Sequence, residues 1–418
     1  MVAKIVELLS PAKDMISLNS AINNGADSIY VGLDGFNMRA NAANFSIDQI
    51  SEAVDICHEN GVKLYVCINT SLKEAEINYL KITMPLIKDS GADAVIVSDL
   101  GAVKIAADCG IDVHMSVQAN ITNTEALNLL SKLGVTRTIL SRELSIQEIG
   151  QIANDSKLDV EVFVHGAMCV AVSGRCFLSS YLYNKSANCG DCLQPCRKEW
   201  KIISEDKDEF IIGNEQISTT QNKWLDNDPS THIMSPKDLC MLEHIPLLIE
   251  SGVKVFKIEG RARPADYVAT VTRIYREAIT AYENGEWNSI KHAENVDMWL
   301  DNLQKVFNRG FDTGFYFKTP HKTSSSNEAK LKKLNLGEVV NYYNKVHAAE
   351  VKLWADVYDG DDLIVQGKTT GSIELKVESM QINGKQVNKA FKGHNVAISI
   401  KNKVRPGDIV YKIIPRTD

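Results

Sequence analysis

The 418-residue sequence has no run of about 18 uninterrupted apolar residues, and its start, MVAKIVELLSPAKD, lacks the basic segment and apolar stretch of an export signal. We therefore expect no membrane span and a cytoplasmic protein. With 46 Lys+Arg against 53 Asp+Glu, the chain also lacks the positive excess that nonspecific polyanion binding by the whole surface requires. A local basic patch remains compatible with this composition.

Familiar hydrolase motifs are also missing. There is no H-E-x-x-H, since His58 and Glu59 are not followed by a second histidine, and there is no G-x-S-x-G nucleophile turn. No G-x-G-x-x-G follows the first expected strand, which disfavours a dinucleotide-binding fold. A cysteine peptidase that pairs Cys169 or Cys176 with His165 stays an alternative, because such an enzyme needs only a thiolate beside an imidazole.

Short apolar segments recur along the first 260 residues, each followed by a stretch with helical periodicity. They lie at 5–9, 28–33, 63–69, 94–100, 113–117, 137–143, 160–166 and 255–260. Such segments are typical of parallel strands covered by helices on both faces. We predict an α/β fold, a (β/α)₈ TIM-like barrel over residues 1–290, with a doubly wound open sheet as the alternative.

The rest of the chain divides by composition. An insertion at 167–250, between the seventh and eighth strands, is far longer than an ordinary connection and holds most of the cysteines. A helical extension is expected at 291–318 and a polar linker at 319–333. Residues 334–418 alternate apolar and polar side chains between turns, which predicts a small antiparallel β-barrel domain.

Polar residues follow the predicted strands. In a barrel of this type the active site lies at the carboxyl ends of the strands, so we expect these side chains to converge there. Each alone could be a loop cap or an ion-pair partner, but together they indicate a site for a small polar or anionic molecule, with arginine recognising carboxylate. The predicted catalytic residues are Asn69, Gln118, Arg142, His165, Glu259 and Arg261, with Asp99 and Arg263 beside them.

Nine cysteines in a chain without an export signal favour metal binding or redox chemistry over disulfides. Four lie within 28 residues: Cys169, Cys176, Cys192 and Cys196. Four thiolates can hold zinc or an iron–sulfur cluster. Zinc ribbons usually show two C-x₂-C pairs, whereas only Cys189 and Cys192 form one here. We therefore predict a 4Fe–4S cluster and keep zinc as the alternative metal.

The segment EVFVHGAMCVAVSGRCFLS at 161–179 resembles the defining motif of peptidase family U32, the collagenase-like peptidases of unassigned mechanism. Further similar segments extend the resemblance over roughly residues 5–320, and the β-rich tail is similar to the family's accessory domain. These segments are ELLSPA at 7–12, GADSIYVG at 25–32, NMRANAANFS at 37–46, SPKDLC at 235–240, KIEGRAR at 257–263 and FNRGFDTGF at 307–315.

The resemblance implies iron–sulfur-dependent, oxygen-independent hydroxylation of an RNA base, a tRNA wobble uridine or an rRNA cytidine, linked to prephenate. By motif, the cluster ligands would be the four cysteines named above, with Cys240 as an alternate fourth ligand. Other family members hydroxylate the ubiquinone ring. Collagenase-like peptidase activity, hydroxylation of a quinone ring and a metal-stapled scaffold without activity are the alternatives.

These expectations define the partners. A prephenate-like carboxylate would lie near Arg142, Arg261 or Arg263, and a second subunit stays open as a source of electrons. RNA would dock on a basic run of the tail, for which an ordinary solvated charged face is the alternative. This run comprises Lys385, Lys389, Lys392, Lys401, Lys403 and Arg405.

Overall fold

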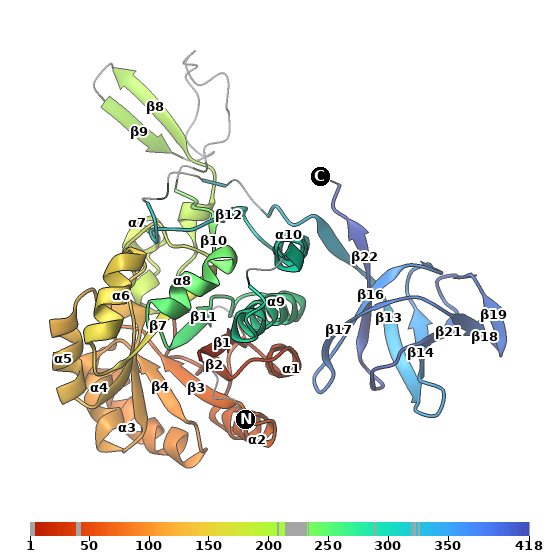
Figure 1. Ribbon diagram of the computed structural model, residues 1–418, viewed down its shortest axis with the longest axis horizontal. Helices are drawn as coiled ribbons and strands as arrows, with labels where there is room; N and C mark the ends of the chain where they lie inside the picture. Colours follow the sequence, from red (N-terminus) through yellow and green to blue (C-terminus); the bar gives the residue numbers. More distant parts are fainter. Residues whose placement is uncertain are drawn as a thin grey trace.

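The structure is a computed structural model that describes residues 5–38, 43–206, 209–213, 234–287, 290–318 and 327–417, together with 232, 320, 323 and 324. Its main body is a closed barrel of eight parallel strands (Figure 1). The strands are β1 (Glu7–Pro11), β2 (Ser28–Gly32), β3 (Lys63–Ile68), β4 (Ala94–Val97), β5 (Asp112–Met115), β6 (Val135–Ile139), β7 (Asp159–Gly166) and β11 (Val255–Ile258). Because β11 pairs in parallel with both β1 and β7, the predicted TIM-like barrel is confirmed and the open-sheet alternative is wrong.

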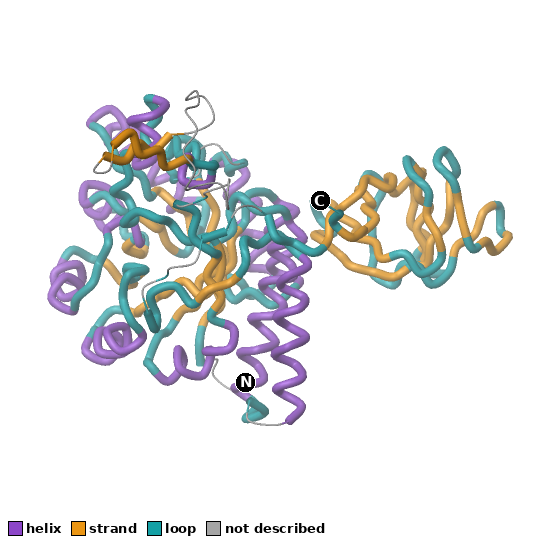
Figure 2. The backbone as a smooth tube through the Cα atoms, turned by 90° about the horizontal axis from the view of Figure 1, so that it is seen from above, coloured by secondary structure: helices purple, strands orange, loops and turns teal. Residues whose placement is uncertain are grey.

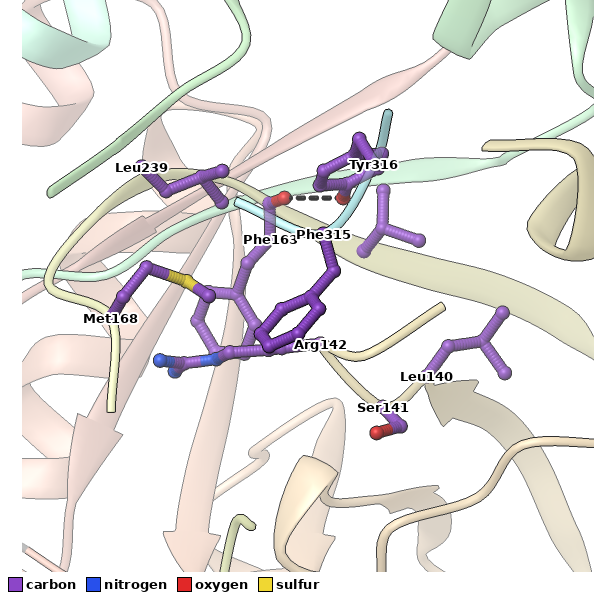
Figure 3. Close-up of a pocket in the computed structure, with 9 residues that line it drawn as sticks. Leu140, Ser141, Arg142, Phe163, Met168, Leu239, Phe315 and Tyr316 are labelled. Atoms are coloured by element: carbon purple, nitrogen blue, oxygen red, sulfur yellow. Dashed lines mark hydrogen bonds between the residues drawn. The ribbon is translucent and has the colours of Figure 1, made fainter. Parts of the chain in front are cut away.

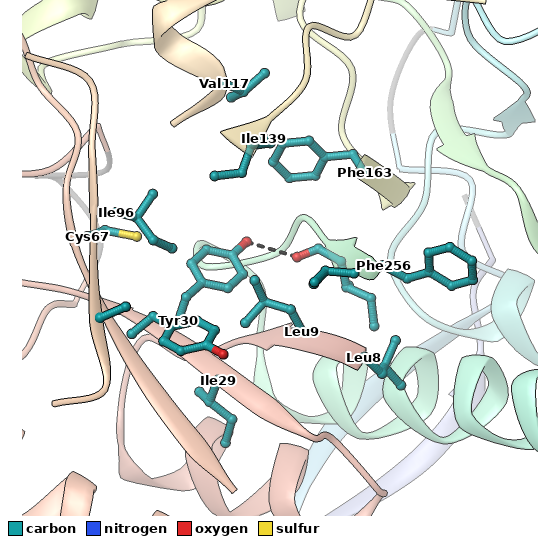
Figure 4. Close-up of a cluster of buried hydrophobic side chains, with 14 of the residues drawn as sticks. Leu8, Leu9, Ile29, Tyr30, Cys67, Ile96, Val117, Ile139, Phe163 and Phe256 are labelled. Atoms are coloured by element: carbon teal, nitrogen blue, oxygen red, sulfur yellow. Dashed lines mark hydrogen bonds between the residues drawn. The ribbon is translucent and has the colours of Figure 1, made fainter. Parts of the chain in front are cut away.

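Helices cover the outside of the barrel. They are α1 (Met15–Asn23), α2 (Ile47–Glu59), α3 (Glu74–Asp89), α4 (Leu100–Asp108), α5 (Thr124–Lys132), α6 (Ile146–Asp155), α8 (Ile245–Glu250) and α9 (Ala265–Glu283). In α2, a capping box between Ser46 and Gln49 starts the helix, and Ile50, Val54 and Cys57 are buried against the strands. The strands contribute buried side chains to both faces, among them Leu8, Leu9 and Ile29 (Figure 4).

The barrel also encloses charged side chains. Arg137 of β6 donates from Nη1 and Nη2 to the two carboxylate oxygens of Glu7, at 2.9 and 2.8 Å. Lys257 Nζ lies 2.8 Å from Oε1 of Glu161, whose side chain is completely buried. Burial alone would raise the pKa of Glu7, but the hydrogen bonds and charge of Arg137 outweigh it and hold that pKa below its usual value. The interior is therefore an apolar core with a paired ionic layer.

A long excursion links β7 to β11 across the mouth of the barrel. It contains α7 (Leu178–Tyr183), the hairpin of β8 (Lys201–Asp206) and β9 (Glu209–Gly213), and β10 (Asp238–Cys240), which pairs antiparallel with β7. Beyond α9, the helix α10 (Ile290–Lys305) leads to β12 (Phe311–Asp312), which pairs with β10. The predicted helical extension therefore includes a strand that returns to the barrel sheet, and a bridge between Pro236 and Thr323 continues this contact.

The C-terminal domain is an antiparallel sheet of eight strands in the order β17-β16-β22-β13-β14-β21-β18-β19. These are β13 (Leu331–Tyr343), β14 (Ala348–Leu353), β16 (Asp362–Gly367), β17 (Gly371–Lys376), β18 (Met380–Ile382), β19 (Lys385–Val387), β21 (Asn395–Ser399) and β22 (Ile409–Pro415), while β15 (Val357–Tyr358) pairs with β20 (Lys389–Ala390). The predicted antiparallel architecture is confirmed. The first strand begins at Leu331, inside the segment predicted as the linker 319–333, and the domain has its own apolar core.

This second domain protrudes beside α1 and α9 (Figure 2). Asn19 and Asn23 of α1 donate to the backbone carbonyls of Lys368 and Thr370, at 2.9 and 3.3 Å. In the described part of the chain, none of the helices has both the length and the apolar character needed to cross a membrane.

Candidate functional site

A hollow lies where the excursion crosses the carboxyl ends of the barrel strands, with about 1070 Å³ of empty space that includes its opening to solvent. The four cysteines predicted as cluster ligands all line it: Cys169, Cys176, Cys192 and Cys196. The first follows β7, the second precedes α7, and the other two belong to the returning loop. The excursion therefore brings together thiols that are up to 27 positions apart in the sequence.

Two glycines let the excursion pass close over the strand ends. A Cβ on Gly166, at φ +106°, would lie 2.4 Å from the backbone oxygen of Glu259, and one on Gly174, at φ +73°, would lie 2.6 Å from that of Gln118. Both contacts are too short for any side chain. The cysteine loops are thus seated directly on the barrel, and Asn188 fixes one of them by accepting from the backbone N–H of Cys176 at 3.1 Å.

Arg197 connects the beginning and the end of the cysteine segment. Its Nη2 donates to the backbone carbonyl of Met168, next to Cys169, while Nη1 donates to Pro236 O at 2.6 Å and Ser235 Oγ at 3.0 Å. Arg197 itself follows Cys196 directly and lines the hollow. Arg197 was not among the residues predicted from the sequence, although its position directly after a predicted ligand is a signal that could have identified it.

The thiols share one electrostatic environment. Burial raises the pKa of Cys196 to about 11; the Arg197 charge opposes this shift, and the other three sulfurs reinforce it. Burial likewise raises the pKa of Cys176, again with contributions from its neighbouring sulfurs. Within the described ranges, no three His, Cys, Asp or Glu side chains meet closely enough to hold a single metal ion.

The two remaining cysteines of this region have different surroundings. Cys189 is half-buried in the 187–189 turn and is not among the residues that line the hollow. Cys240 is buried on β10, where its sulfur accepts from Tyr275 Oη at 3.8 Å. Of the two candidates for the fourth ligand, Cys196 shares the hollow with the other three cysteines and Cys240 does not.

Three of the predicted polar residues line the same hollow: Gln118, Arg142 and Glu259, with Arg263 beside them. Arg142 donates to Ala167 O at 2.9 Å and its guanidinium lies 4.1 Å from the centre of the Phe163 ring (Figure 3). The buried Oε1 of Gln118 accepts no hydrogen bond in the described structure. An unpaired acceptor and two guanidinium groups therefore line the same hollow, the kind of polar grouping that orients a small polar ligand.

Asn69 and Asp99 line a smaller polar hollow that shares Gln118 and Gly174 with the first. Asn69 accepts from Met38 N at 3.2 Å. Asp99 caps α4 by accepting from the backbone N–H of Gly101 at 2.8 Å, which is the helix-capping role that a polar residue at this position often has.

His165 lies outside both hollows. Strict strand alternation would point it into the barrel with Glu161 and Phe163, but the register of β7 against β11 shifts at Val164 and turns the imidazole outward. There it is completely buried and lies 3.3 Å from Tyr275 Oη of α9. Burial lowers its pKa to about 3, so the imidazole is neutral at physiological pH.

Arg261 also lies away from the hollow. The turn after β11, closed by the bond from Arg263 N to Gly260 O at 2.8 Å, points Arg263 toward the cysteines and Arg261 toward β2. Arg261 donates from Nη2 to Asn37 Oδ1 at 2.9 Å and is 5% exposed. A position-by-position sequence argument could not distinguish the two arginines.

Known proteins resemble this chain over almost its whole length. It is 46% identical over 418 residues to an uncharacterized protease of Methanocaldococcus jannaschii, an alignment that covers 97% of this chain and 98% of the relative. It is 36% identical over 431 residues to a collagenase of Porphyromonas gingivalis, covering 99% of each. It is 30% identical over 414 residues to tRNA hydroxylation protein P of Haemophilus influenzae, covering 90% and 88%. Because the profile of peptidase family U32 also matches residues 13–326, the chain belongs to that family.

Proposed function

We propose that this protein is an iron–sulfur-dependent hydroxylase of an RNA base, a tRNA wobble uridine or an rRNA cytidine, that does not use molecular oxygen. The observation that carries the proposal is that four cysteines line one hollow at the mouth of the barrel, beside polar strand ends. Similarity to a tRNA hydroxylation protein supports it.

The donor set of the hollow fits a 4Fe–4S cluster. Cys169, Cys176, Cys192 and Cys196 would ligate it, and when bound the cluster would supply electron transfer. Four thiolates add negative charge in a partly buried place. The guanidinium groups of Arg142, Arg197 and Arg263, which line the same hollow, would offset that charge.

A small carboxylate completes the proposed site. Replacing a C–H bond of the base by C–OH is a two-electron oxidation. A second reactant must supply the oxygen atom, the displaced hydrogen must leave as a proton, and an external electron acceptor must take up the two electrons. A prephenate-like carboxylate is what the family resemblance implies. Arg142 and Arg263 offer it charged donors, and the unpaired Oε1 of Gln118 would accept from a hydroxyl group of the ligand. Burial lowers the pKa of Arg263, while Phe307 lies 3.5 Å beneath its guanidinium and fixes its orientation.

The test compares Cys176→Ser with Cys189→Ser, because only the first thiol lines the hollow. Wild-type protein and Cys189→Ser purified without oxygen should contain about four iron and four sulfide per chain. Cys176→Ser should lose both. In a deletion strain, one hydroxylated nucleoside should disappear, as measured by mass spectrometry, and should return with Cys189→Ser but not with Cys176→Ser. Colourless, zinc-loaded wild-type protein would contradict the proposal.

Collagenase-like proteolysis is the second candidate, favoured by the names of two relatives. It would need an imidazole beside Cys169 or Cys176, whereas His165 is buried against Tyr275. Cleavage of gelatin by metal-free protein, abolished by Cys169→Ser, would support it. An iron–sulfur protein that changes no nucleoside would instead point to a quinone ring or to a metal-stapled scaffold.

For RNA docking by the tail, the basic run is split between two places. Lys385, Lys389 and Lys392 are exposed on β19, β20 and the next turn. Lys403 and Arg405, together with Arg273, line an open polar cleft against α1 and α9. We propose that the first group contacts phosphates. Replacing all three lysines by Ala should flatten the salt dependence of RNA binding by up to about three phosphate contacts.

A further inference from the structure

The helix α7, which borders the cysteine hollow, carries two highly exposed aromatic side chains at its start. Phe177 is 74% exposed and Tyr181 is 90% exposed. They are four residues apart at the start of α7, where Tyr181 N donates to Phe177 O at 2.8 Å, so both rings lie on the same side of the helix. Burial of large aromatic surfaces is favourable, so two such rings exposed to water on the same side of a short helix indicate a surface that a ligand covers.

Other residues of the same segment line the hollow itself. These are Leu178 and Ser179, two and three positions after Cys176. Ser179 is buried, its Oγ accepts from Leu193 N at 3.1 Å, and Asn184 ends the helix in the left-handed region with φ 53°. The helix that carries the aromatic pair is therefore anchored beside the cysteine hollow.

Positive charge surrounds this pair. Residues 167–200 contain four Lys and Arg against two acidic residues, in a chain whose net charge is -7. Arg175, Lys185 and Lys198 are exposed around α7. The Lys198 ammonium lies 4.9 Å from the centre of the Tyr183 ring and donates to its hydroxyl at 3.0 Å.

Rings and cations interleaved in this way match the chemistry of unpaired RNA. Unpaired bases present faces that stack on aromatic side chains, and the phosphates between them attract lysine and arginine. A base-paired helix hides those faces. A purely apolar partner surface would leave the cations without a role.

We infer that Phe177 and Tyr181 form a stacking platform for unpaired bases that flank the reacting base. This inference rests on the proposed RNA substrate and specifies it further: the enzyme selects loops or single strands over duplex, and the platform holds the strand while one base enters the hollow beside α7.

The experiment uses the complete protein purified without oxygen and a synthetic RNA hairpin with a uridine-rich loop. Phe177→Ala and Tyr181→Ala should each weaken binding by about 5- to 150-fold, the range expected for losing one base–aromatic stack. Tyr181→Phe keeps the aromatic face and should bind like wild type. Tyr181→Leu keeps an apolar side chain without that face and should bind like Tyr181→Ala. Leu129→Ala on α5, at a residue that is 59% exposed, serves as a control for surface truncation and should change nothing.

The outcomes separate the platform from the proposed function. If wild type neither binds the hairpin nor makes a hydroxylated nucleoside, the proposed function fails and the platform with it. If wild type does both and the four α7 variants bind equally well, the platform alone is wrong. Equal affinity of wild type for the hairpin and for a duplex of the same composition would also overturn it. A change in the oligomeric state of the Ala variants, measured by light scattering, would also overturn the platform, because it would show that this face binds another protein chain.

Discussion

Arg197 supports a quantitative prediction, because its hydrogen bonds connect the two ends of the segment that carries the cysteines. In Arg197→Met the bonds to the carbonyls of Met168 and Pro236 are lost. A hydrogen bond from a charged donor contributes about 1.5–3 kcal/mol, so two such bonds at the low end give about 3 kcal/mol. We therefore expect the equilibrium between Cys196 in the hollow and Cys196 displaced from it to shift by roughly 100-fold.

The assay is the rate at which metal-free protein reacts with a maleimide at Cys196, read by mass spectrometry. Labelling should accelerate by up to about 100-fold in Arg197→Met if displacement controls the rate. The Arg197 charge lowers the pKa of this thiol, so its removal alone would slow labelling. A faster labelling rate in Arg197→Met would therefore show that Cys196 leaves the hollow more often than in wild type. Iron bound after anaerobic reconstitution should also be lost more quickly to a chelator.

Lys198→Met is the matched control, because it removes the same charge one residue later from an exposed side chain that contacts Tyr183 instead. It should label and reconstitute like wild type. Equal labelling rates in Arg197→Met and wild type would show that the hydrogen bonds of Arg197 do not hold Cys196 in the hollow. Equal acceleration in Arg197→Met and Lys198→Met would mean that the loss of a positive charge, rather than of these bonds, changes the labelling rate.

Two further predictions concern the buried ion pairs of the barrel and a glycine of the cysteine loop. Lys257→Met removes the nearer of two cations beside the completely buried Glu161, at 2.8 Å, and leaves Arg137 at 3.6 Å. It should lower the free energy of unfolding by about 1.5–3 kcal/mol, the contribution of a hydrogen bond to a charged group, and Lys257→Met combined with Glu161→Leu should recover most of this loss. A single-variant loss below about 1 kcal/mol in urea would contradict this account. Gly174→Ala should abolish iron binding, because the added Cβ would collide with the backbone carbonyl oxygen of Gln118. Gly110→Ala is the control: Gly110 has a similar φ of +68°, and the nearest atom to its Cβ is 3.7 Å away, so this variant should lose only about 1 kcal/mol of stability and keep the iron. Retention of iron in Gly174→Ala would show that the loop has room to move.

The barrel was predictable because the strands are mostly apolar on both faces, apart from charged residues such as Arg137 and Glu161, and all eight expected strands are present. Their ends were less predictable. The strand expected at 94–100 ends at Val97 in the structure, and the residues after it belong to a loop and to the start of α4. The short strands β10 and β12 were not anticipated, because strands of two or three residues are defined by their partners and carry no periodic pattern of their own.

The hollow was predictable in part. The cysteines converge because the excursion starts and ends at adjacent strands, β7 and β11. His165 could not be placed, because a single extra residue at Val164 reverses the direction of its side chain, and bulges leave little trace in sequence. Arg197 could not be placed either, because its role depends on carbonyls that lie far away along the chain.

The pairing of β12 with β10 makes the barrel depend on residues that follow α10. Asp238 N donates to Gly310 O at 3.0 Å, and Ser324 N donates to Ser235 O at 2.9 Å, so stretches that lie 72 and 89 positions apart in the sequence close the same rim. A gene fusion or truncation that removes the tail must therefore cut after Ser324. A cut near residue 290, at the apparent end of the barrel, would remove the strand that pairs with β10 at the end of the cysteine-bearing excursion. Relatives that carry a different C-terminal domain should therefore keep the segment up to Ser324.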